Sequence, residues 1–367
     1  MTLLWIHLLS LLGSIISSMT GKLSRNQSTA LTLLMPVSAL FMTIGLANDV
    51  FDGEVIRETF SWIPLLGIDI AFRLDGLALL FVFMILGIGI LVIFYARYYL
   101  SNNDSMPKLY AYLMLFMTAM LGIVMSNNVI QLWFFWELTS ISSFLLISYW
   151  WHKSEARKGA VMALAVTGAG GLALLAGLLL LGNVVGSYNL DVILSSRDII
   201  QSHDLYEVTL ILILLGAFTK SAQFPFHFWL PHAMAAPTPV SAYLHSATMV
   251  KAGIFLLARF YPALAGTDIW FIIVSLTGLT TLLFGAYVAL FKHDLKGLLA
   301  YSTISHLGLI TLLLGLDTKI ADVAAIFHII NHATFKASLF MATGIIDHET
   351  GTRDMRKLNG MWKFMPY

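Results

Sequence analysis

The sequence predicts an all-α integral membrane protein with about eleven transmembrane helices, and two observations support this class. Of the 367 residues, 58% are hydrophobic and only 11% are charged, whereas about a quarter of the residues in a soluble domain are charged. A globular core of this size could not hide so much apolar surface from water. In addition, apolar runs recur along the chain that reach the roughly 20 residues a helix needs to cross a bilayer.

Composition also excludes several function classes. The formal net charge is +1, so there is no excess of basic residues to indicate nucleic-acid binding. The chain has no cysteine, which excludes thiolate metal sites, iron–sulfur clusters, catalytic thiols and disulfides. No cofactor-binding motif is evident, and we expect none to be bound. The apolar segment 3–18 lacks the basic region and cleavage site of a signal peptide, so it is interpreted as the first membrane span.

Scanning for apolar runs places the spans near residues 2–19, 28–48, 74–96, 109–126, 128–150, 158–182, 207–230, 238–261, 268–291, 295–315 and 320–345. The loops then alternate between two sides with unequal numbers of Lys and Arg. One side holds 13 of them and the other holds Arg57, Arg73, Arg197 and Lys319. Because basic loops stay inside, this bias predicts that the N-terminus is outside, in a bacterial plasma membrane.

Three connecting segments have patterns of their own. Residues 49–73 alternate between apolar and polar side chains around Pro64 and Gly67, which predicts a β-hairpin over the outer face. Residues 183–206 resemble a loop with a short amphipathic piece. Residues 346–367 form a polar inner loop that leads into the start of a twelfth helix, at Met361, Trp362, Phe364, Met365 and Pro366. This suggests a fragment of a longer protein.

Three charged residues lie near the middle of predicted spans: Glu137 in the fifth, Lys220 in the seventh and Lys251 in the eighth. A charge at this depth costs at least about 2.5–3.5 kcal/mol, so such residues are functional candidates. Glu137 is the one acidic residue placed near the middle of a span, and facing it toward a lysine reduces the desolvation cost of both. A static structural pair would explain Glu137 and Lys220. Lys251 adds a further buried base, which favours a proton relay.

Histidines extend this line of polar groups. His245 precedes Lys251 by six positions and would lie about 120° from it around one helix, either to pass protons sideways or as a satisfied polar group. His328, His332 and Lys336 are four residues apart, so they share one face of the eleventh span. Two histidines at this spacing could bind a metal, but no convincing third ligand appears. Proton transfer is favoured, because neutral imidazole both accepts and donates a proton.

Helix-breaking residues lie beside these charges. Pro225 follows Lys220 closely and lacks the backbone N–H that a continuous helix needs, so it predicts a kink or break in the seventh span. Transporters use such discontinuous helices to place backbone dipoles near mid-membrane ions. The sixth span contains four glycines, which favour close helix packing over chemistry: Gly168, Gly170, Gly171 and Gly177.

The run from Lys220 to Gly253 resembles the signature of the antiporter-like subunits of respiratory complex I and of the Mrp multisubunit Na⁺/H⁺ antiporters. Three further segments fit the same family: Trp136-Glu137, Leu298–Ser305 and His328–Ala337. Within the family, the stretches Trp133–Trp151 and Asp347–Asp354 are most similar to the N-terminal part of the A-subunit branch. The resemblance covers essentially the whole chain.

This resemblance implies helices 1–3 with the hairpin (residues 1–108), a first five-helix repeat (109–261) and the start of a second, inverted repeat (262–367). It implies a Glu137–Lys220 pair, a relay of Lys251 with His245, and a path along His328 and His332 toward a lysine in the twelfth helix. Lys296 lies in an inner loop and could supply this path, or could be an ordinary basic loop residue.

The function that follows is proton translocation in a monovalent cation (Na⁺)/H⁺ antiporter, together with other membrane subunits and with no cofactor. No cluster of Na⁺ ligands is evident in the sequence. One alternative is a proton-pumping subunit of complex I or of a membrane-bound hydrogenase. The other is a structural scaffold whose buried charges are inert.

Overall fold

The computed structural model describes residues 1–63 and 68–365, so the turn expected at Pro64 and Gly67 and the helix start expected at Pro366 lie outside the described residues. Long helices make up most of the described chain. They are α1 (Thr2–Met19), α2 (Arg25–Phe51), α3 (Gly76–Tyr99), α4 (Met106–Met125), α5 (Val129–Ile147), α6 (Ser154–Val185), α9 (Tyr206–Lys220), α11 (Thr238–Ser246), α12 (Met249–Leu264), α13 (Asp268–Leu290), α14 (Leu295–Gly315) and α15 (Lys319–Thr350).

Ten segments in the described chain are long and apolar enough to cross a membrane, and they coincide with ten of the eleven predicted spans. The tenth predicted span, 295–315, matches α14 at both ends. Apolar side chains such as Phe271, Leu276 and Leu283 cover the exposed face of α13. An exposed apolar helix face of this kind is the surface that a protein presents to lipid.

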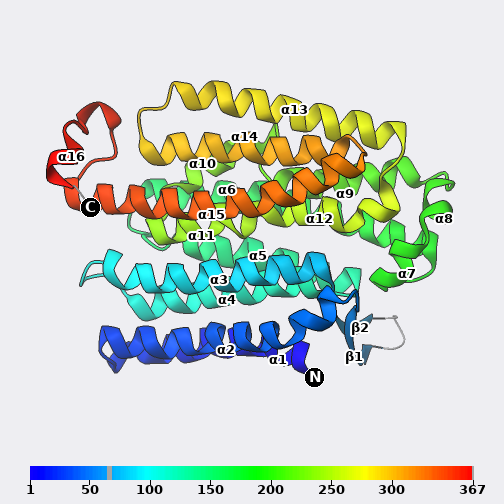
Figure 1. The fold of residues 1–367 in the computed structure, drawn as a ribbon, viewed down its shortest axis with the longest axis horizontal. Coiled ribbons are helices and arrows are strands. Elements are labelled where there is room, and N and C mark those ends of the chain that lie inside the picture. Colours follow the sequence, from blue (N-terminus) through cyan, green and yellow to red (C-terminus); the bar gives the residue numbers. More distant parts are fainter. Residues whose placement is uncertain (64–67, 366–367) are drawn as a thin grey trace.

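The helices run roughly parallel to one another in stacked layers (Figure 1). α1 and α2 pack together at one edge, α13 and α14 at the other, and α5, α6, α9, α11, α12 and α15 lie between. The hairpin and the short helices α7 (Leu190–Ser195) and α8 (Arg197–Gln201) lie at one end, here called the hairpin end. The short helices α10 (Trp229–Ala233) and α16 (Met361–Phe364) lie toward the opposite end, called the α16 end.

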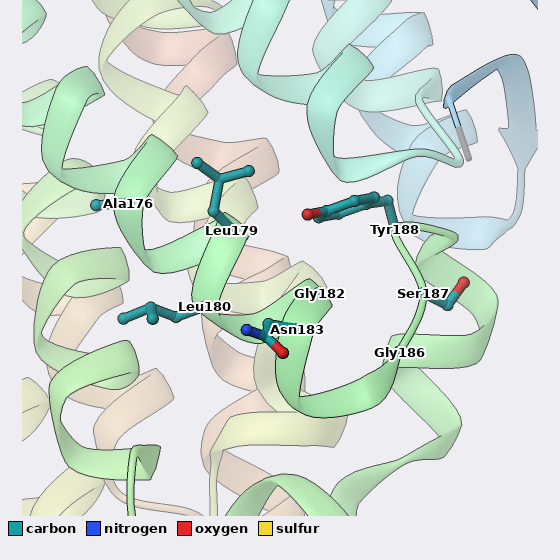
Figure 2. A pocket seen from close by; sticks show the side chains of 8 residues that line it. All are labelled: Ala176, Leu179, Leu180, Gly182, Asn183, Gly186, Ser187 and Tyr188. Carbon is teal, nitrogen blue, oxygen red and sulfur yellow. The ribbon is translucent and has the colours of Figure 1, made fainter. Parts of the chain in front are cut away.

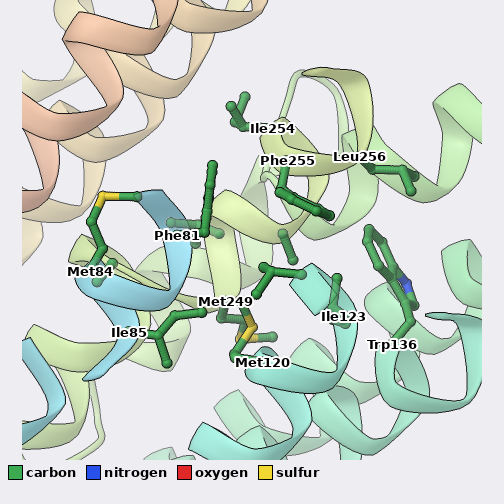
Figure 3. Packing of buried hydrophobic residues seen from close by; sticks show 14 of the residues in the cluster. Phe81, Met84, Ile85, Met120, Ile123, Trp136, Met249, Ile254, Phe255 and Leu256 are labelled. Carbon is green, nitrogen blue, oxygen red and sulfur yellow. The ribbon is translucent and has the colours of Figure 1, made fainter. Parts of the chain in front are cut away.

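The apolar core joins α3, α4 and α12 and reaches Trp136 of α5 (Figure 3). Phe81 and Phe255 pack edge to face with ring centroids 5.0 Å apart. Met120 and Met249 are fully buried in the same cluster. Water is therefore excluded from one side of the segment that carries Glu137, which follows Trp136 directly.

The predicted break in the seventh span is confirmed. α9 ends at Lys220, and the next helical segment of the chain begins only at Phe226. The intervening backbone does not continue the helical hydrogen-bond pattern: the N–H of Gln223 donates to the carbonyl of Phe218, and that of Phe224 donates to the hydroxyl of Thr281 on α13. Lys220 thus lies at a free helix end inside the bundle, where its backbone is not locked into a longer helix.

The eighth span is also interrupted, and the expectation of one continuous helix over 238–261 is wrong. α11 ends at Ser246 and α12 begins at Met249. Thr248 has non-helical backbone angles (φ −127°, ψ −100°), and its hydroxyl donates to the carbonyl of Tyr243 at 2.6 Å. A side chain that takes a helical carbonyl in this way competes with the helix itself. The 120° relation expected between His245 and Lys251 therefore does not hold, because they lie on different helices.

The predicted β-hairpin is confirmed as an antiparallel pair, β1 (Ile56–Ile63) and β2 (Ile68–Leu74). An ionic network ties it to the bundle. Arg259 of α12 and Arg73 of β2 both pair with Asp75, the N-cap residue of α3, and Arg73 also pairs with Asp191 of α7. Through Asp75, the hairpin end of α12 is thereby connected to the start of α3 and to β2.

Burial alone would raise the pKa of Asp75, but the hydrogen bond and charge of Arg259 outweigh it. The backbone N–H of Ala78 and the charge of Arg73 add to this effect, so the pKa of Asp75 is held well below its usual range. Asp191 behaves in the same way: burial acts to raise its pKa, and Arg57, Asn127 and Arg73 lower it overall. Both carboxylates are therefore charged at neutral pH.

Candidate functional site

Lys220 and Glu137 approach each other across α9 and α5, but they do not form a direct ion pair within 4.0 Å in the described structure. The Lys220 amine is fully buried and donates to the carbonyl of Trp136 at 3.1 Å and to the hydroxyl of Ser140 at 2.8 Å. It also lies 5.2 Å from the centroid of the Trp136 ring. The amine is thus held one residue away from Glu137 along α5, within electrostatic range of its carboxylate.

Oε1 of Glu137 is buried and has no hydrogen-bond partner in the described structure. It rests instead against the backbone of Gly171 on α6, where any Cβ would collide with it. A buried carboxylate oxygen without a partner costs about 1–3 kcal/mol or more, so it marks a group with a role beyond packing. The prediction that the glycines of the sixth span favour close helix packing over chemistry does not include this contact with Glu137.

Lys251 lies on the first turn of α12, fully buried, and its amine donates to the carbonyl of Ile329 on α15 at 2.7 Å. No carboxylate lies within 4.0 Å of this amine among the described residues. His328 and His332 of α15 are within its electrostatic range. The break between α11 and α12 places a helix N-terminus beside Lys251, and the positive end of that helix dipole opposes a positive charge there.

Three histidines, rather than the two expected, meet between α14 and α15. Nδ1 of His306 lies 2.9 Å from Nε2 of His328, so the two rings share a hydrogen bond. The ring of His332 lies 5.4 Å from that of His306, and both its nitrogens are buried without partners. Sequence reasoning missed His306 because a single histidine in an apolar span gives no spacing signal. No group of ligands fit to hold a metal ion is found in the described part of the chain.

Lys336 continues this cluster toward the α16 end. Its buried amine donates to the hydroxyl of Ser302 at 2.8 Å and to the carbonyl of Leu299 at 3.3 Å, both on α14. It also lies within electrostatic range of His306 and His332. The structure therefore groups Lys251, His306, His328, His332 and Lys336 at the contact of α12, α14 and α15.

Lys296 is not a loop residue, and its placement in an inner loop is wrong. It lies in the first turn of α14, is 2% exposed, and donates to the carbonyls of Ala236 (2.8 Å) and Met234 (3.4 Å). The helix begins at Leu295, the residue before Lys296, because Asp294 caps it by accepting from the N–H of Gly297. Burial at a helix start therefore separates Lys296 from the exposed basic residues of the loops.

His245 is fully buried on α11, with neither ring nitrogen hydrogen-bonded. Lys296 is within its electrostatic range, and the rings of Trp229 and Phe340 flank it at 6.5 and 6.1 Å. The described structure shows no hydrogen bond between His245 and Lys251. In the described structure His245 therefore interacts electrostatically with Lys296 and is not hydrogen-bonded to Lys251, the lysine with which it was expected to act.

Two surface cavities lie toward opposite ends of the bundle. A polar cavity of about 470 Å³ at the α16 end includes Lys296 in its wall, together with Lys153, Glu155, Asp294, Asp347 and Arg353. A groove of about 820 Å³ follows the hairpin end of α6 and includes Asn183 and Tyr188 (Figure 2). The groove has no charged lining residue, whereas the polar cavity reaches a buried lysine.

Two family models match the chain. The model described as "NADH:quinone oxidoreductase/Mrp antiporter, TM" matches residues 126–367. The model described as "NADH-Ubiquinone oxidoreductase (complex I), chain 5 N-terminus" matches residues 62–110. Together they cover every predicted site residue.

Curated relatives are considerably longer than this chain. The A/B-type subunit of a probable K⁺/H⁺ antiporter from Rhizobium meliloti is 63% identical over 325 residues, which are 89% of this chain and 32% of the relative. The A-type subunit of the Na⁺/H⁺ antiporter of Alkalihalophilus pseudofirmus is 51% identical over 349 residues, 91% of this chain and 43% of the relative. The chain thus spans 32% and 43% of the length of these two relatives.

Solved structures share the fold. The Mrp complex from Dietzia sp. DQ12-45-1b contains a chain that matches with a TM-score of 0.90 and 40% identity, covering 100% of this chain and 40% of that one. A chain of the membrane-bound sulfane sulfur reductase, an archaeal respiratory membrane complex, matches with a TM-score of 0.88 and 24% identity, covering 99% and 75%. The second likeness concerns the fold alone.

Proposed function

Because the chain belongs to the NADH:quinone oxidoreductase/Mrp antiporter family, we propose that it is a proton-translocating subunit of a multisubunit monovalent cation/H⁺ antiporter. In this proposal it works beside other membrane subunits, as a transporter rather than an enzyme, and uses the proton gradient to export a cation. Na⁺ is the ion proposed. K⁺ is the specific alternative, because the relative with 63% identity is named for K⁺.

The observation that carries the proposal is a set of four buried lysines without a carboxylate within 4.0 Å in the described structure: Lys220, Lys251, Lys296 and Lys336. Each amine donates instead to backbone carbonyls, and two of them also to hydroxyls. A structural ion pair inside a bundle requires an opposite charge in contact. Amines bound to neutral oxygens lack that charge and can act as proton carriers.

The order of the groups suggests a route. Glu137 biases the charge on Lys220, and a change in that pairing drives a proton toward Lys251. From Lys251 the proton reaches the imidazoles at the contact of α14 and α15 and then Lys336. The hydrogen bond between His306 and His328 supplies a direct link between two carriers, since imidazole passes a proton through its two nitrogens.

Orientation and repeat organisation complete the proposal. The excess of basic residues in alternate loops predicts that the hairpin end faces outward and the α16 end faces the bacterial cytoplasm. The polar cavity beside Lys296 would then open on the inner side. Residues 109–261 would form the first five-helix repeat and residues 262–367 the start of the second.

Exchange in everted vesicles tests the function. The full-length protein, produced with its partner subunits, should dissipate an imposed pH gradient when Na⁺ is added, and vesicles lacking the complex should not. A response to K⁺ that exceeds the response to Na⁺ would replace the proposed cation. An assembled complex that leaves the gradient unchanged with both ions would contradict the antiporter proposal.

Lys251→Ala separates transport from an inert scaffold. We expect exchange to fall by about 100-fold, the usual loss when a proton-transferring group is removed, with assembly intact. Lys319→Ala, which removes an exposed lysine at the start of α15, is the matched control and should leave exchange unchanged. Full exchange in the Lys251→Ala complex would support the inert scaffold.

The second candidate function is a proton-pumping subunit driven by redox chemistry elsewhere, as in complex I. The match of residues 62–110 to the complex I chain 5 model favours it, and the likeness to the archaeal protein shows that the same fold occurs in a respiratory membrane complex. Neighbouring genes distinguish the two. Small antiporter subunits support the antiporter, whereas quinone-binding and iron–sulfur subunits support the redox-driven pump.

A further inference from the structure

The side chain of Glu137 lies directly against the backbone of Gly171. A Cβ at Gly171 would overlap Oε1 of Glu137, and it would also approach Trp136 at 3.4 Å. The indole N–H of Trp133 donates to the carbonyl of Gly171 at 2.9 Å, which holds α5 and α6 together at this level. The absence of a side chain at Gly171 is therefore what makes room for the carboxylate.

In this position against Gly171, the Glu137 carboxylate is not hydrogen-bonded to Lys220. The Lys220 amine is occupied by Trp136 and Ser140, and Oε1 of Glu137 has no partner in the described structure. The two groups nevertheless interact electrostatically. Glu137 is thus seen apart from the lysine rather than paired with it.

We propose that Gly171 is a positioning residue that provides the seat for the unpaired Glu137 carboxylate during transport. The inference rests on the proposed function, since it assigns a resting place to a group of the transport path. A pairing that opens and closes needs two positions of comparable free energy. Packing against a bare backbone supplies the second position, and any side chain at residue 171 removes it.

The same helix offers a matched control. Gly168 lies one turn before Gly171 on α6, and a Cβ there meets no atom within 4 Å. Gly168→Ala therefore adds the same methyl group to the same helix without contacting Glu137. Both substitutions also replace glycine with the better helix former, so helix propensity does not distinguish them.

A first experiment reports the position of Glu137 directly. Dicyclohexylcarbodiimide adds to protonated carboxyl groups in apolar surroundings, and peptide mass spectrometry measures how much Glu137 it modifies. In the assembled full-length complex, Gly171→Ala should lower this labelling severalfold, because the carboxyl group displaced from α6 then pairs with the Lys220 ammonium, and that pairing favours the ionised form, which does not react. Gly168→Ala should label like wild type. Equal labelling in all three proteins overturns the proposal.

A second experiment links the seat to transport. Gly171→Ala should slow exchange about tenfold, since it shifts the balance between the two positions by about a decade. In the Glu137→Asp background, whose shorter side chain leaves room for the methyl group, Gly171→Ala should cause no further loss. An equal fold loss in both backgrounds, or no loss in either, overturns the role in transport.

Glu137→Ala distinguishes a failure of the proposed function of Glu137 from a failure of the proposed role of Gly171. If Glu137→Ala transports at the wild-type rate, the proposed function of Glu137 fails, whatever the labelling shows. If Glu137→Ala is inactive and Gly171→Ala is fully active with unchanged labelling, only the seat is wrong.

Discussion

Replacing Lys220 with alanine is expected to reduce cation/proton exchange by about 100-fold, the scale of losing a proton-transferring group, while the complex still assembles. The amine is fully buried at the end of α9 and is held at 3.1 Å from the carbonyl of Trp136 and 2.8 Å from the hydroxyl of Ser140. Alanine preserves the helix but leaves Glu137 without a charge to act on. Exchange in everted vesicles, normalised to assembled complex, measures the effect.

Lys220→Arg distinguishes a proton carrier from a fixed charge. Arginine keeps a positive charge and does not release a proton at any relevant pH, so a carrier role predicts that exchange is lost in this variant as well. Lys158→Ala removes an exposed lysine of α6 and should transport normally. Wild-type rates in the Lys220→Ala complex would remove Lys220 from the path and leave transport to a partner subunit.

Asp75→Asn is expected to destabilise the protein by about 3 kcal/mol, because removing one partner of a buried ion pair leaves the other charge uncompensated. Arg259 is 4% exposed and Asp75 is 16% exposed, so solvent screens this pair little. Asparagine caps a helix as well as aspartate does, and the substitution therefore leaves the cap of α3 intact. Thermal unfolding of the purified complex in detergent measures the loss.

The pH dependence of this difference has a defined sign. The pKa of Asp75 is held well below its usual range, so its stabilising effect is complete above the unfolded value of about 4. It is lost only as the pH falls through the lower, folded value. Wild type and Asp75→Asn should therefore differ by a constant amount from neutral pH down to about pH 5 and converge in stronger acid.

Two comparisons control the Asp75 experiment. Asp204→Asn alters an exposed aspartate near the hairpin end and should leave the unfolding temperature unchanged. Asp75→Asn combined with Arg259→Gln should recover part of the loss, because no unpaired charge then remains buried. If Asp75→Asn unfolds at the wild-type temperature, the ion pair does not stabilise the fold.

Features of the fold that depend on local sequence were predictable. The length of an apolar run is a property of the chain itself, which is why the limits of α14 agree with the prediction. Alternation along 56–63 and 68–74 belongs to the local sequence in the same way, and the hairpin is confirmed. Pro225 removes a backbone donor whatever surrounds it, so the break after Lys220 follows from the sequence.

Features that depend on tertiary contacts between helices could not be predicted from local sequence. The break in the eighth span involves neither proline nor glycine. It depends on the hydroxyl of Thr248 capturing the carbonyl of Tyr243, a choice that tertiary packing decides. His306 and Gly171 likewise could not be identified as site residues from the sequence, because their importance lies in their contacts with His328 and Glu137 on other helices. A single histidine or glycine in an apolar run carries no such information.

The buried lysines have an electrical consequence. A protonated amine that is not neutralised by a nearby carboxylate feels the membrane voltage as a net charge. Moving one charge across the whole bilayer changes the free energy by about 2.3 kcal/mol per 100 mV, and a step across part of it changes the energy in proportion. Each proposed transfer among Lys220, Lys251 and Lys336 that advances along the membrane normal would therefore be driven or opposed by voltage. The resting potential of the cell would act on the proton occupancy of these sites as directly as the pH on either side.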